Sequence, residues 1–335
     1  IADMKWFSSS KGKEAQLHQS LTQTIREEDL FQFASLDEGD AERRGGASYS
    51  YWRSIFRAFR QNKLAMVMLI IMVVLVAFTF LQPLLPGQFK PDAITKNLKG
   101  LPLKNSPPTA EHWMGTNSIG QDLWARLWSG TRNSLFIGLM AALLQGTIGI
   151  LMGVLWGYVR KLDYLFTEIY NVLDNIPNTI VLILISFILR PGMSTIIFAM
   201  SITGWIGMAR FIRNQVLIIR DRDYNIASRC LGTSTSRIIF RNLLPYLVSV
   251  IMLRTALSIP SAIGSEVFIT YIGLGLPSTE PSLGTLINEG RKLMLSPNLR
   301  YQLIYPTLVL STITVSFYIV GNAFSDAADP RNHLQ

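Results

Sequence analysis

Long apolar stretches constrain this chain more than any other feature of its sequence. Four of them contain no Asp, Glu, Lys or Arg: 64–89, 133–159, 191–209 and 301–325. Two more, 164–189 and 242–271, contain only a few ionisable residues. Because a bilayer core about 30 Å thick requires roughly 20 apolar residues per helix, each stretch is long enough to cross a membrane. We expect an all-α integral membrane protein with six transmembrane helices.

The composition is typical of a membrane protein. Only 16% of the 335 residues are charged and the mean hydropathy is +0.29, which excludes an ordinary soluble domain of this length. The formal net charge of +9 is explained by basic residues that flank the predicted spans. We therefore expect membrane lipid, and no nucleic acid, as a partner.

The distribution of Lys and Arg predicts the orientation of the chain. If the N-terminus is cytoplasmic, 20 of these residues lie on the inner side and 10 on the outer side, as the positive-inside rule requires. We expect a multi-pass protein with both termini in the cytoplasm. The expected segments are a cytoplasmic polar tail at 1–48, an amphipathic elbow helix at 49–63, a first transmembrane helix at 64–86, an outer loop at 87–130, a five-helix core at 131–325 and a cytoplasmic tail at 326–335.

The segment 49–63 combines aromatic residues at helical spacing with four basic residues. Phe56 and Phe59 belong to the apolar set, and Arg53 and Arg57 belong to the cations. This pattern predicts a basic amphipathic helix that lies along the inner membrane surface. The alternative is an ordinary extension of the first transmembrane helix.

The end of the outer loop carries a second aromatic helix face. Trp124 and Trp128 follow one another at helical spacing, so we expect a helix here that leans on the outer surface of the membrane. His112 precedes it without a second His or Cys at metal-ligand spacing. A packing or hydrogen-bonding role is therefore expected for His112, and no metal site.

The charged segment 220–245, between the fourth and fifth predicted spans, is the most informative part of the sequence. Residues 224–231 suit a short helix that ends at Gly232, because glycine adopts the left-handed conformation without steric penalty. Thr233 or Ser234 then caps a second short helix that leads back to the membrane. The small residues of the first helix allow close approach to a groove on another protein. A capped hairpin without any partner is the alternative.

This hairpin resembles the cytoplasmic coupling loop of ABC importer permeases, in which Glu-Ala-Ala is followed after three residues by Gly. Ala227 and Gly232 match that pattern, whereas Ile226 stands in place of the glutamate and Ser228 in place of the second alanine. The ATPase-coupling residues that the resemblance implies are Asn225, Ile226, Ala227, Ser228, Arg229 and Gly232. The departure at Ile226 removes the charge through which the family's glutamate contacts the ATPase.

Three more stretches resemble the dipeptide and oligopeptide permease family, C-type subunit: 112–139, 266–293 and 324–331. The resemblance extends from Tyr49 to Arg331, and within the family it is strongest to oligopeptide permeases of Gram-positive bacteria. It implies a type I ABC importer permease fold in the cell membrane of a bacterium. It also implies a second permease subunit, two ABC ATPase subunits and an external peptide-binding protein as partners, and a peptide as substrate.

The same resemblance implies a transport subunit rather than an enzyme. No catalytic residue is expected, because the sequence contains no Walker motif, no His-Glu-x-x-His pair and no Gly-x-Ser-x-Gly elbow. We expect no cofactor in this chain, with ATP and Mg on the partner ATPase subunits. The alternatives are permeases of the same family for dipeptides, nickel or another small solute, an ion-coupled secondary transporter, and an intramembrane enzyme.

Ionisable residues inside the predicted spans need a partner or water, because a charge at mid-bilayer costs about 2.5 to 3.5 kcal/mol. Asp174 and Arg254 lie at matching depths if both helices are straight, so we expect either an intramembrane ion pair or separate positions along the transport pathway. Glu266 lies nearer the outer side and is a third candidate for a structural or pathway role.

Overall fold

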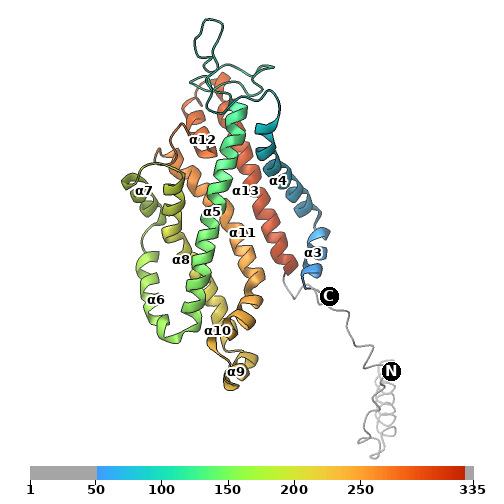
Figure 1. Ribbon diagram of the computed structural model, residues 1–335, viewed down its shortest axis with the longest axis vertical. Helices are drawn as coiled ribbons and strands as arrows, with labels where there is room; N and C mark the ends of the chain where they lie inside the picture. Colours follow the sequence, from blue (N-terminus) through green and yellow to red (C-terminus); the bar gives the residue numbers. More distant parts are fainter. Residues whose placement is uncertain (1–50, 329–335) are drawn as a thin grey trace, which may run out of the picture. The chain divides into compact units, whose positions relative to one another are not determined.

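The computed structural model describes residues 51–328. The expected tail at 1–48, the start of the amphipathic helix and residues 329–335 lie outside the described residues. The described part is built from helices (Figure 1). Five helices are long and apolar enough to cross a membrane, and a bent pair of shorter helices gives a sixth span if it is counted as one. The expectation of an all-α membrane protein is confirmed.

The described chain starts with two helices that meet at Asn62. α3 covers Tyr51–Gln61, with Ile55 and Phe59 buried and Arg53 and Arg57 exposed, as the amphipathic pattern predicts. α4 covers Lys63–Leu81, and η2 follows at Gln82–Leu84. The Asn62 side chain accepts a hydrogen bond from Ala65 N, so it caps α4 and separates it from α3.

α5 (Leu123–Tyr158) and α8 (Met193–Arg220) form the central pair of helices (Figure 1). Gly149, Gly153 and Gly157 line one face of α5 at intervals of four residues. A Cβ added to Gly153 would lie 2.5 Å from the carbonyl oxygen of Ala209 on α8. The glycines therefore allow the two backbones to approach closely, as small residues do in membrane helix pairs.

The helix expected to lean on the outer surface is instead the first part of α5. Asp122 caps α5 by accepting a hydrogen bond from Ala125 N, and the helix continues without a break into the membrane span. Trp124 and Trp128 pack against Phe78 of α4, with ring centroids 5.7 and 4.6 Å apart. The aromatic face therefore packs against α4, and the expected boundary at residue 130 was wrong.

The third predicted span is broken. α6 covers Arg160–Asp174 and α7 covers Asn178–Ile188, and their axes differ by 76°. Pro177 lies at the break, where its ring excludes a helical hydrogen bond and disfavours helical geometry at Ile176. The span expected over 164–189 is therefore bent, and it is a sixth span only if α6 and α7 are counted together.

The rest of the chain forms a hairpin and three further helices. α9 (Asp223–Cys230), α10 (Thr235–Ile238) and the π-helical turn η3 (Ile239–Leu243) lead into α11 (Leu244–Tyr271). α12 (Leu283–Lys292) begins with a capping box at Ser282 and Thr285, η4 covers Pro297–Leu299, and α13 covers Tyr301–Ala328.

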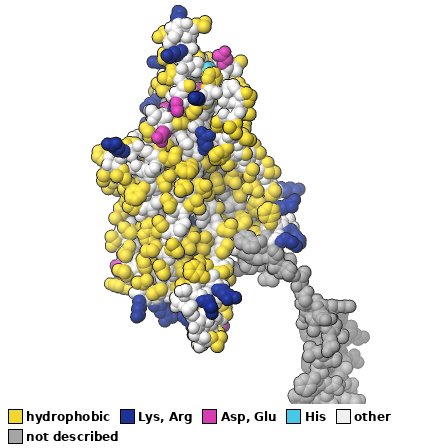
Figure 2. Space-filling view, viewed as in Figure 1, with side chains coloured by type: hydrophobic (Ala, Val, Ile, Leu, Met, Phe, Trp, Pro, Cys, Tyr) yellow, Lys and Arg dark blue, Asp and Glu magenta, His cyan; other side chains and the backbone are white. Residues whose placement is uncertain are grey.

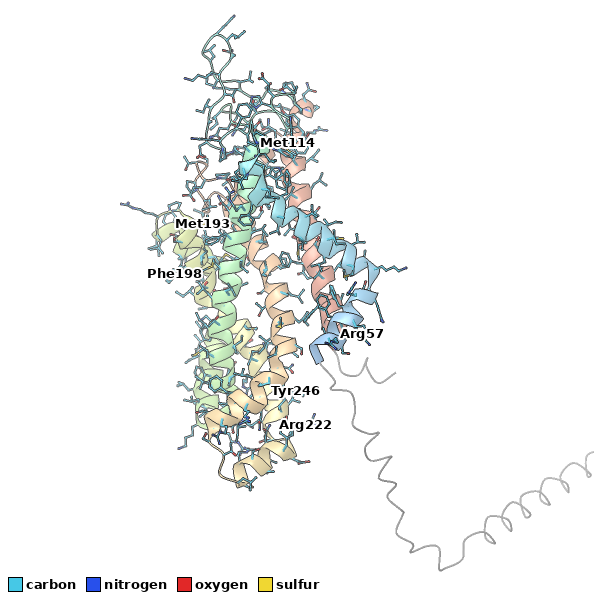
Figure 3. The ribbon with its side chains drawn as sticks, turned by 45° about the vertical axis from the view of Figure 1, so that its right-hand side comes forward. Arg57, Met114, Met193, Phe198, Arg222 and Tyr246 are labelled. Carbon is cyan, nitrogen blue, oxygen red and sulfur yellow. The ribbon has the colours of Figure 1, made fainter. Side chains whose placement is uncertain are left out.

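The long helices run side by side, so the bundle that they form has two ends (Figure 1). We call the end that carries the loop 85–122 and α12 the loop end, and the end that carries α9 and α10 the hairpin end (Figure 1). Arg222 and Tyr246 lie at the hairpin end, opposite Met114 (Figure 3). Hydrophobic side chains cover most of the middle of the face in Figure 2. This distribution fits helices that are embedded in lipid between the two ends.

Candidate functional site

A cavity of about 340 Å³ opens between α5, α7, α8, α11 and α13. Its lining is rich in polar side chains: Gln145, Asn178, Arg254, Thr255, Ser258, Ser261, Ser265 and Tyr318. On α11, Arg254, Ser258, Ser261 and Ser265 follow one another at intervals of four, three and four residues. They therefore share one face of the helix, which we call the polar stripe. A polar stripe in a membrane span indicates a water-filled or substrate-filled space beside it.

Arg254 is the only charged residue that lines this cavity among residues 51–328. Its guanidinium carbon lies 5.5 Å from the centroid of the Phe211 ring on α8. No carboxylate of the described chain lies within ion-pair distance of it. Its position ten residues after the start of α11 corresponds to a depth of about 15 Å along the helix.

The structure does not bring Asp174 and Arg254 together. Asp174 accepts a hydrogen bond of 2.6 Å from Tyr170 Oη, and Arg210 Nη1 lies 4.0 Å from its Oδ2. The Asp174 side chain is 57% exposed in this chain. The expected pairing was wrong because the matching depths assumed a straight third span, whereas α6 ends at Asp174 and the chain then turns.

Glu266 belongs to a buried hydrogen-bond chain rather than to the cavity lining. It has no exposed surface and accepts hydrogen bonds from Ser134 Oγ at 2.8 Å and Thr270 Oγ1 at 3.1 Å. Ser134 Oγ in turn accepts a hydrogen bond from Leu283 N at the start of α12. Glu266 thus joins α5, α11 and α12, which favours the structural alternative for this residue.

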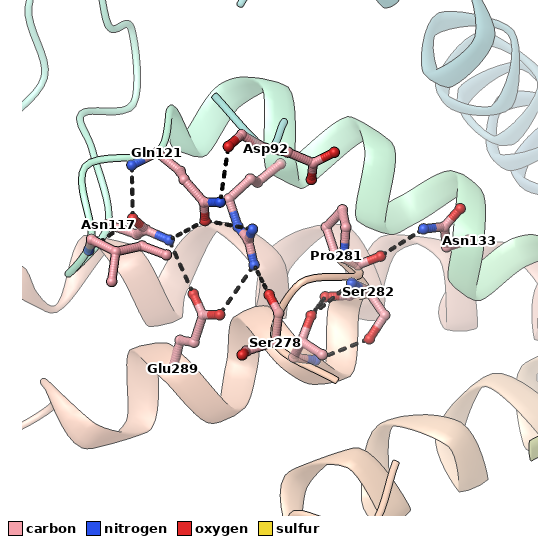
Figure 4. Close-up of polar contacts among 11 residues, drawn as sticks. Asp92, Asn117, Gln121, Asn133, Ser278, Pro281, Ser282 and Glu289 are labelled. Carbon is pink, nitrogen blue, oxygen red and sulfur yellow. Dashed lines mark hydrogen bonds and ion pairs between the residues drawn. The ribbon is translucent and has the colours of Figure 1, made fainter. Parts of the chain in front are cut away.

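A second charged cluster, which the sequence analysis missed, lies at the loop end (Figure 4). The buried Arg126 of α5 donates to Gln121 Oε1 at 2.6 Å, Ser278 O at 3.1 Å and Glu289 Oε1 at 3.1 Å. Asn117 Nδ2 donates to Gln121 Oε1 at 3.0 Å. We call this set the loop-end network. It connects the loop that precedes α5 to α12.

His112 lies beside this network and packs inside the protein. Its Nδ1 lies 2.7 Å from Asp122 Oδ1, and its ring stacks on Phe89 with centroids 4.6 Å apart. Asp122 also caps α5, so His112 fixes the residue that starts the helix. This geometry agrees with the packing and hydrogen-bonding role expected for His112.

The hairpin between α8 and α11 has the local structure that its sequence predicts. Gly232 adopts φ +76°, and no atom lies within 4 Å of a Cβ added there. Ser234 occupies the N-cap position of α10, although its side chain makes no capping hydrogen bond. Of the expected coupling residues, Ile226, Ala227, Arg229 and Gly232 are exposed, and Ser228 is half-buried. The exposed surface of α9 is thus available to another protein.

Asn225 differs from the other residues of this set because it is fully buried. Its Nδ2 donates to Ile219 O of α8 at 2.9 Å, and its Oδ1 accepts from Asn242 Nδ2 of η3 at 3.0 Å. One side chain therefore attaches α9 to both α8 and η3, the turn that leads into α11. Asn225 anchors the hairpin and does not contribute to its exposed face.

Basic residues surround Asp221, where α8 ends and α9 begins. Arg229 Nη2 donates to Asp221 Oδ1 at 3.3 Å, and Arg220 Nη2 donates to Asp221 Oδ2 at 3.2 Å. Burial alone would raise the pKa of Asp221, but the hydrogen bonds from Arg220 and Arg229 outweigh it and lower this pKa from its ordinary value. The carboxylate is therefore ionised and orients Arg229 against the hairpin.

Of the other site residues that were missed in the sequence, two groups left a signal. The intervals of four, three and four residues along the polar stripe are visible within 242–271. Gln145 and Asn178 are polar residues in otherwise apolar stretches, and Gln145 Nε2 donates to Met200 O across the α5–α8 contact. Asn242 left no signal, because its role depends on the π-helical turn that presents it to Asn225.

Two family models match the sequence. The model described as "Binding-protein-dependent transport system inner membrane component" matches residues 146–333. The model described as "N-terminal TM domain of oligopeptide transport permease C" matches residues 50–108. Together they cover α3, α4 and most of the helices that form the cavity and the hairpin.

Several curated relatives are similar over nearly their whole length. The oligopeptide transport system permease protein AmiD of Streptococcus pneumoniae is 38% identical over 307 residues, which are 92% of this chain and 98% of the relative. The oligopeptide transport system permease protein OppC of Bacillus subtilis is 36% identical, over 90% and 97% of the two chains. The dipeptide transport system permease protein DppC of Bacillus subtilis is 37% identical, over 88% and 89%.

A solved structure has a similar fold. A chain of the MetNI methionine ABC transporter in an inward-facing conformation superposes with a TM-score of 0.52 at 19% sequence identity. The match covers 62% of this chain and 96% of the other chain. At this identity the likeness extends to the fold alone.

Proposed function

The chain belongs to the family of inner membrane components of binding-protein-dependent transport systems, and on that premise we propose that it carries oligopeptides inward as one permease subunit of an ABC importer. The observation that supports this proposal best is the cavity with its polar stripe on α11. Peptides carry amide groups and two charged ends, and hydroxyl and amide side chains at membrane depth suit such a substrate. The names of the relatives support a peptide over nickel.

The proposed complex contains a second permease subunit, two ABC ATPase subunits and an external peptide-binding protein. This chain forms half of the pathway, and a second permease covers the open side of the cavity. ATP and Mg bind to the ATPase subunits. The chain itself therefore contributes a pathway and a docking surface, and it lies in the cytoplasmic membrane with both termini inside.

An uptake assay tests the transport proposal. Cells that lack this chain should fail to accumulate a labelled oligopeptide, and expression of the chain with its partners should restore accumulation. Depletion of ATP with the ion gradient intact should abolish uptake. Uptake that persists without ATP would favour an ion-coupled secondary transporter, and uptake of dipeptides or nickel alone would favour the other permeases of the family.

We propose that the exposed face of α9 docks on an ATPase subunit. This proposal rests on the exposure of Ile226, Ala227 and Gly232 and on the open space beside Gly232. Gly232→Trp should lower co-purification of the ATPase and peptide uptake at least tenfold, because the indole would occupy the docking surface.

Gly100→Trp is the matched control for this experiment. Gly100 has φ +77° and no atom within 4 Å of an added Cβ, but it lies at the loop end. The strain of a non-glycine residue is therefore the same in both variants. If the two variants recruit the ATPase equally well, α9 is not the docking surface.

The proposed orientation puts the hairpin in the cytoplasm and the loop end outside. The exposed Cys230 lies at the hairpin end, and the exposed Lys99 lies at the loop end. In a Cys230→Ser background, Lys99→Cys should react with a membrane-impermeant maleimide on intact cells without an outer membrane. Reaction only after permeabilisation would reverse the orientation.

A further inference from the structure

Resting on the proposed peptide transport, we propose that Arg254 forms a carboxylate-binding site in the cavity, and that the Thr255 and Ser261 hydroxyls of the same lining are further donors to the bound peptide. The ligand class is a peptide with a free carboxylate, at its C-terminus or on an acidic side chain. The site would select among the peptides that enter the pathway according to their charge.

The first argument is the lack of a counter-ion for Arg254. Two arginines of α8 have carboxylate partners in this chain: Arg213 Nη2 lies 2.7 Å from Asp163 Oδ1, and Arg210 Nη1 lies 4.0 Å from Asp174 Oδ2. Arg254 has only the ring of Phe211, and among residues 51–328 the cavity contains no acidic residue. A cation at membrane depth is stabilised by an anion, and the open cavity is the place from which an anion can approach.

The second argument is the hydrogen-bonding state of the neighbouring hydroxyl groups. Ser258 Oγ donates to Thr255 O and Ser265 Oγ donates to Ser261 O, so these two protons are used within α11. The side chains of Thr255 and Ser261 line the same cavity, and within the described chain neither hydroxyl has a hydrogen-bond partner. They are therefore available as donors to a peptide that lies in the cavity. Ser261 is seven residues, or about 10.5 Å, along α11 from Arg254, so it would contact a part of the peptide other than the carboxylate.

The third argument is the shape of the guanidinium itself. Its planar fork matches a carboxylate with two parallel hydrogen bonds, and the Phe211 ring on α8 supports one face of the group without using its N–H donors. A lysine in this position would supply the charge but not the two parallel N–H donors of a guanidinium. The chemistry therefore fits a carboxylate better than an amide or a metal ion.

The test compares pairs of peptides that differ in one carboxylate, in the assembled complex with its own binding protein. One pair has a free or an amidated C-terminus, and the other has Glu or Gln at one internal position. For each peptide, uptake by a variant is divided by uptake by the wild type. This ratio cancels the preference of the binding protein, which is the same in both measurements.

Arg254→Gln should lower the ratio for the carboxylate peptides about tenfold more than the ratio for their neutral partners. A tenfold difference is about what the loss of one charge-assisted hydrogen bond would cause. Arg254→Lys should retain part of the preference. Arg190→Gln, the same charge change at an exposed turn outside the cavity, should change neither ratio.

Equal ratios for carboxylate and neutral peptides in Arg254→Gln would overturn the proposal. Loss of assembled complex in Arg254→Gln with recovery in Arg254→Lys would also overturn it, because Arg254 would then pair with another subunit. Failure of the wild type to transport any peptide would refute the proposed function itself, so the two failures are distinguishable.

Discussion

Arg126 and Arg254 lie on adjoining helices of the same membrane domain, but their surroundings are opposite. Arg126 has no exposed surface and donates to three acceptors in the loop-end network. Arg254 faces a cavity and contacts an aromatic ring. The two arginines thus differ in the acceptors around them: those of Arg126 are supplied by this chain, whereas Arg254 has none among the described residues.

The largest expected effect is the loss of Arg126. Arg126→Met leaves the Ser278 carbonyl without its donor and the largely buried Glu289 without its counter-ion, and removal of one member of a buried ion pair costs about 3 to 5 kcal/mol. We expect a strong decrease in folded protein and in the thermal unfolding temperature of the detergent-solubilised chain. The double variant Arg126→Met/Glu289→Met should recover part of the loss, because neither charge then remains unpaired.

Arg254→Met is the matched control for that experiment. It removes the same side chain from α11 without leaving any described carboxylate unpaired. Its unfolding temperature should stay close to that of the wild type. Equal destabilisation by Arg126→Met and Arg254→Met would break the comparison between the two regions.

An intermediate effect is expected at Ser134. Ser134→Ala removes the donor to Glu266 Oε2 and the acceptor for Leu283 N, and an unsatisfied buried group costs about 1 to 3 kcal/mol. Thr131→Ser is a mild control, because the buried Thr131 hydroxyl bonds only Leu127 O of its own helix. Thermal unfolding of the two variants would measure the difference. A Ser134→Ala protein as stable as the control would show that α12 is held by other contacts.

The smallest effect on stability is expected along the polar stripe. Ser261→Ala should change the free energy of unfolding by less than about 0.5 kcal/mol, because this hydroxyl faces the cavity. Uptake of peptides should nevertheless decrease, because a donor in the cavity lining is lost. A thermal shift as large as that of Ser134→Ala would instead indicate that Ser261 is packed against a second subunit in the complex.

The sequence predicted the parts of the fold that depend on local composition. The length of the apolar stretches was sufficient to predict the spans that contain α4, α5, α8, α11 and α13. The turn at Gly232 followed from the conformational freedom of glycine. The break at Pro177 was missed because a proline inside an apolar run has two outcomes, a kinked helix or a broken one. α12 was missed because it is short and carries charged residues.

The site was less predictable, because its contacts join residues that are far apart in the chain. Arg126 and Glu289 are separated by 163 positions, and Ser134 and Glu266 by 132. Each could be recognised as a polar residue near a membrane span, but its partner could not be chosen from several candidates. Asp174 was assigned to Arg254 by depth alone, whereas the chain turn after Asp174 brings it to Arg210.

The separation of Arg126 from Glu289 also sets the order in which this protein can be completed during synthesis. A ribosome adds about 5 to 20 residues per second, so the 163 positions between them correspond to roughly 8 to 30 seconds. During that interval α5 has been made but the acceptor on α12 has not. A nascent chain that stops before α12 therefore retains an arginine without its carboxylate, so the loop-end network closes only late in synthesis.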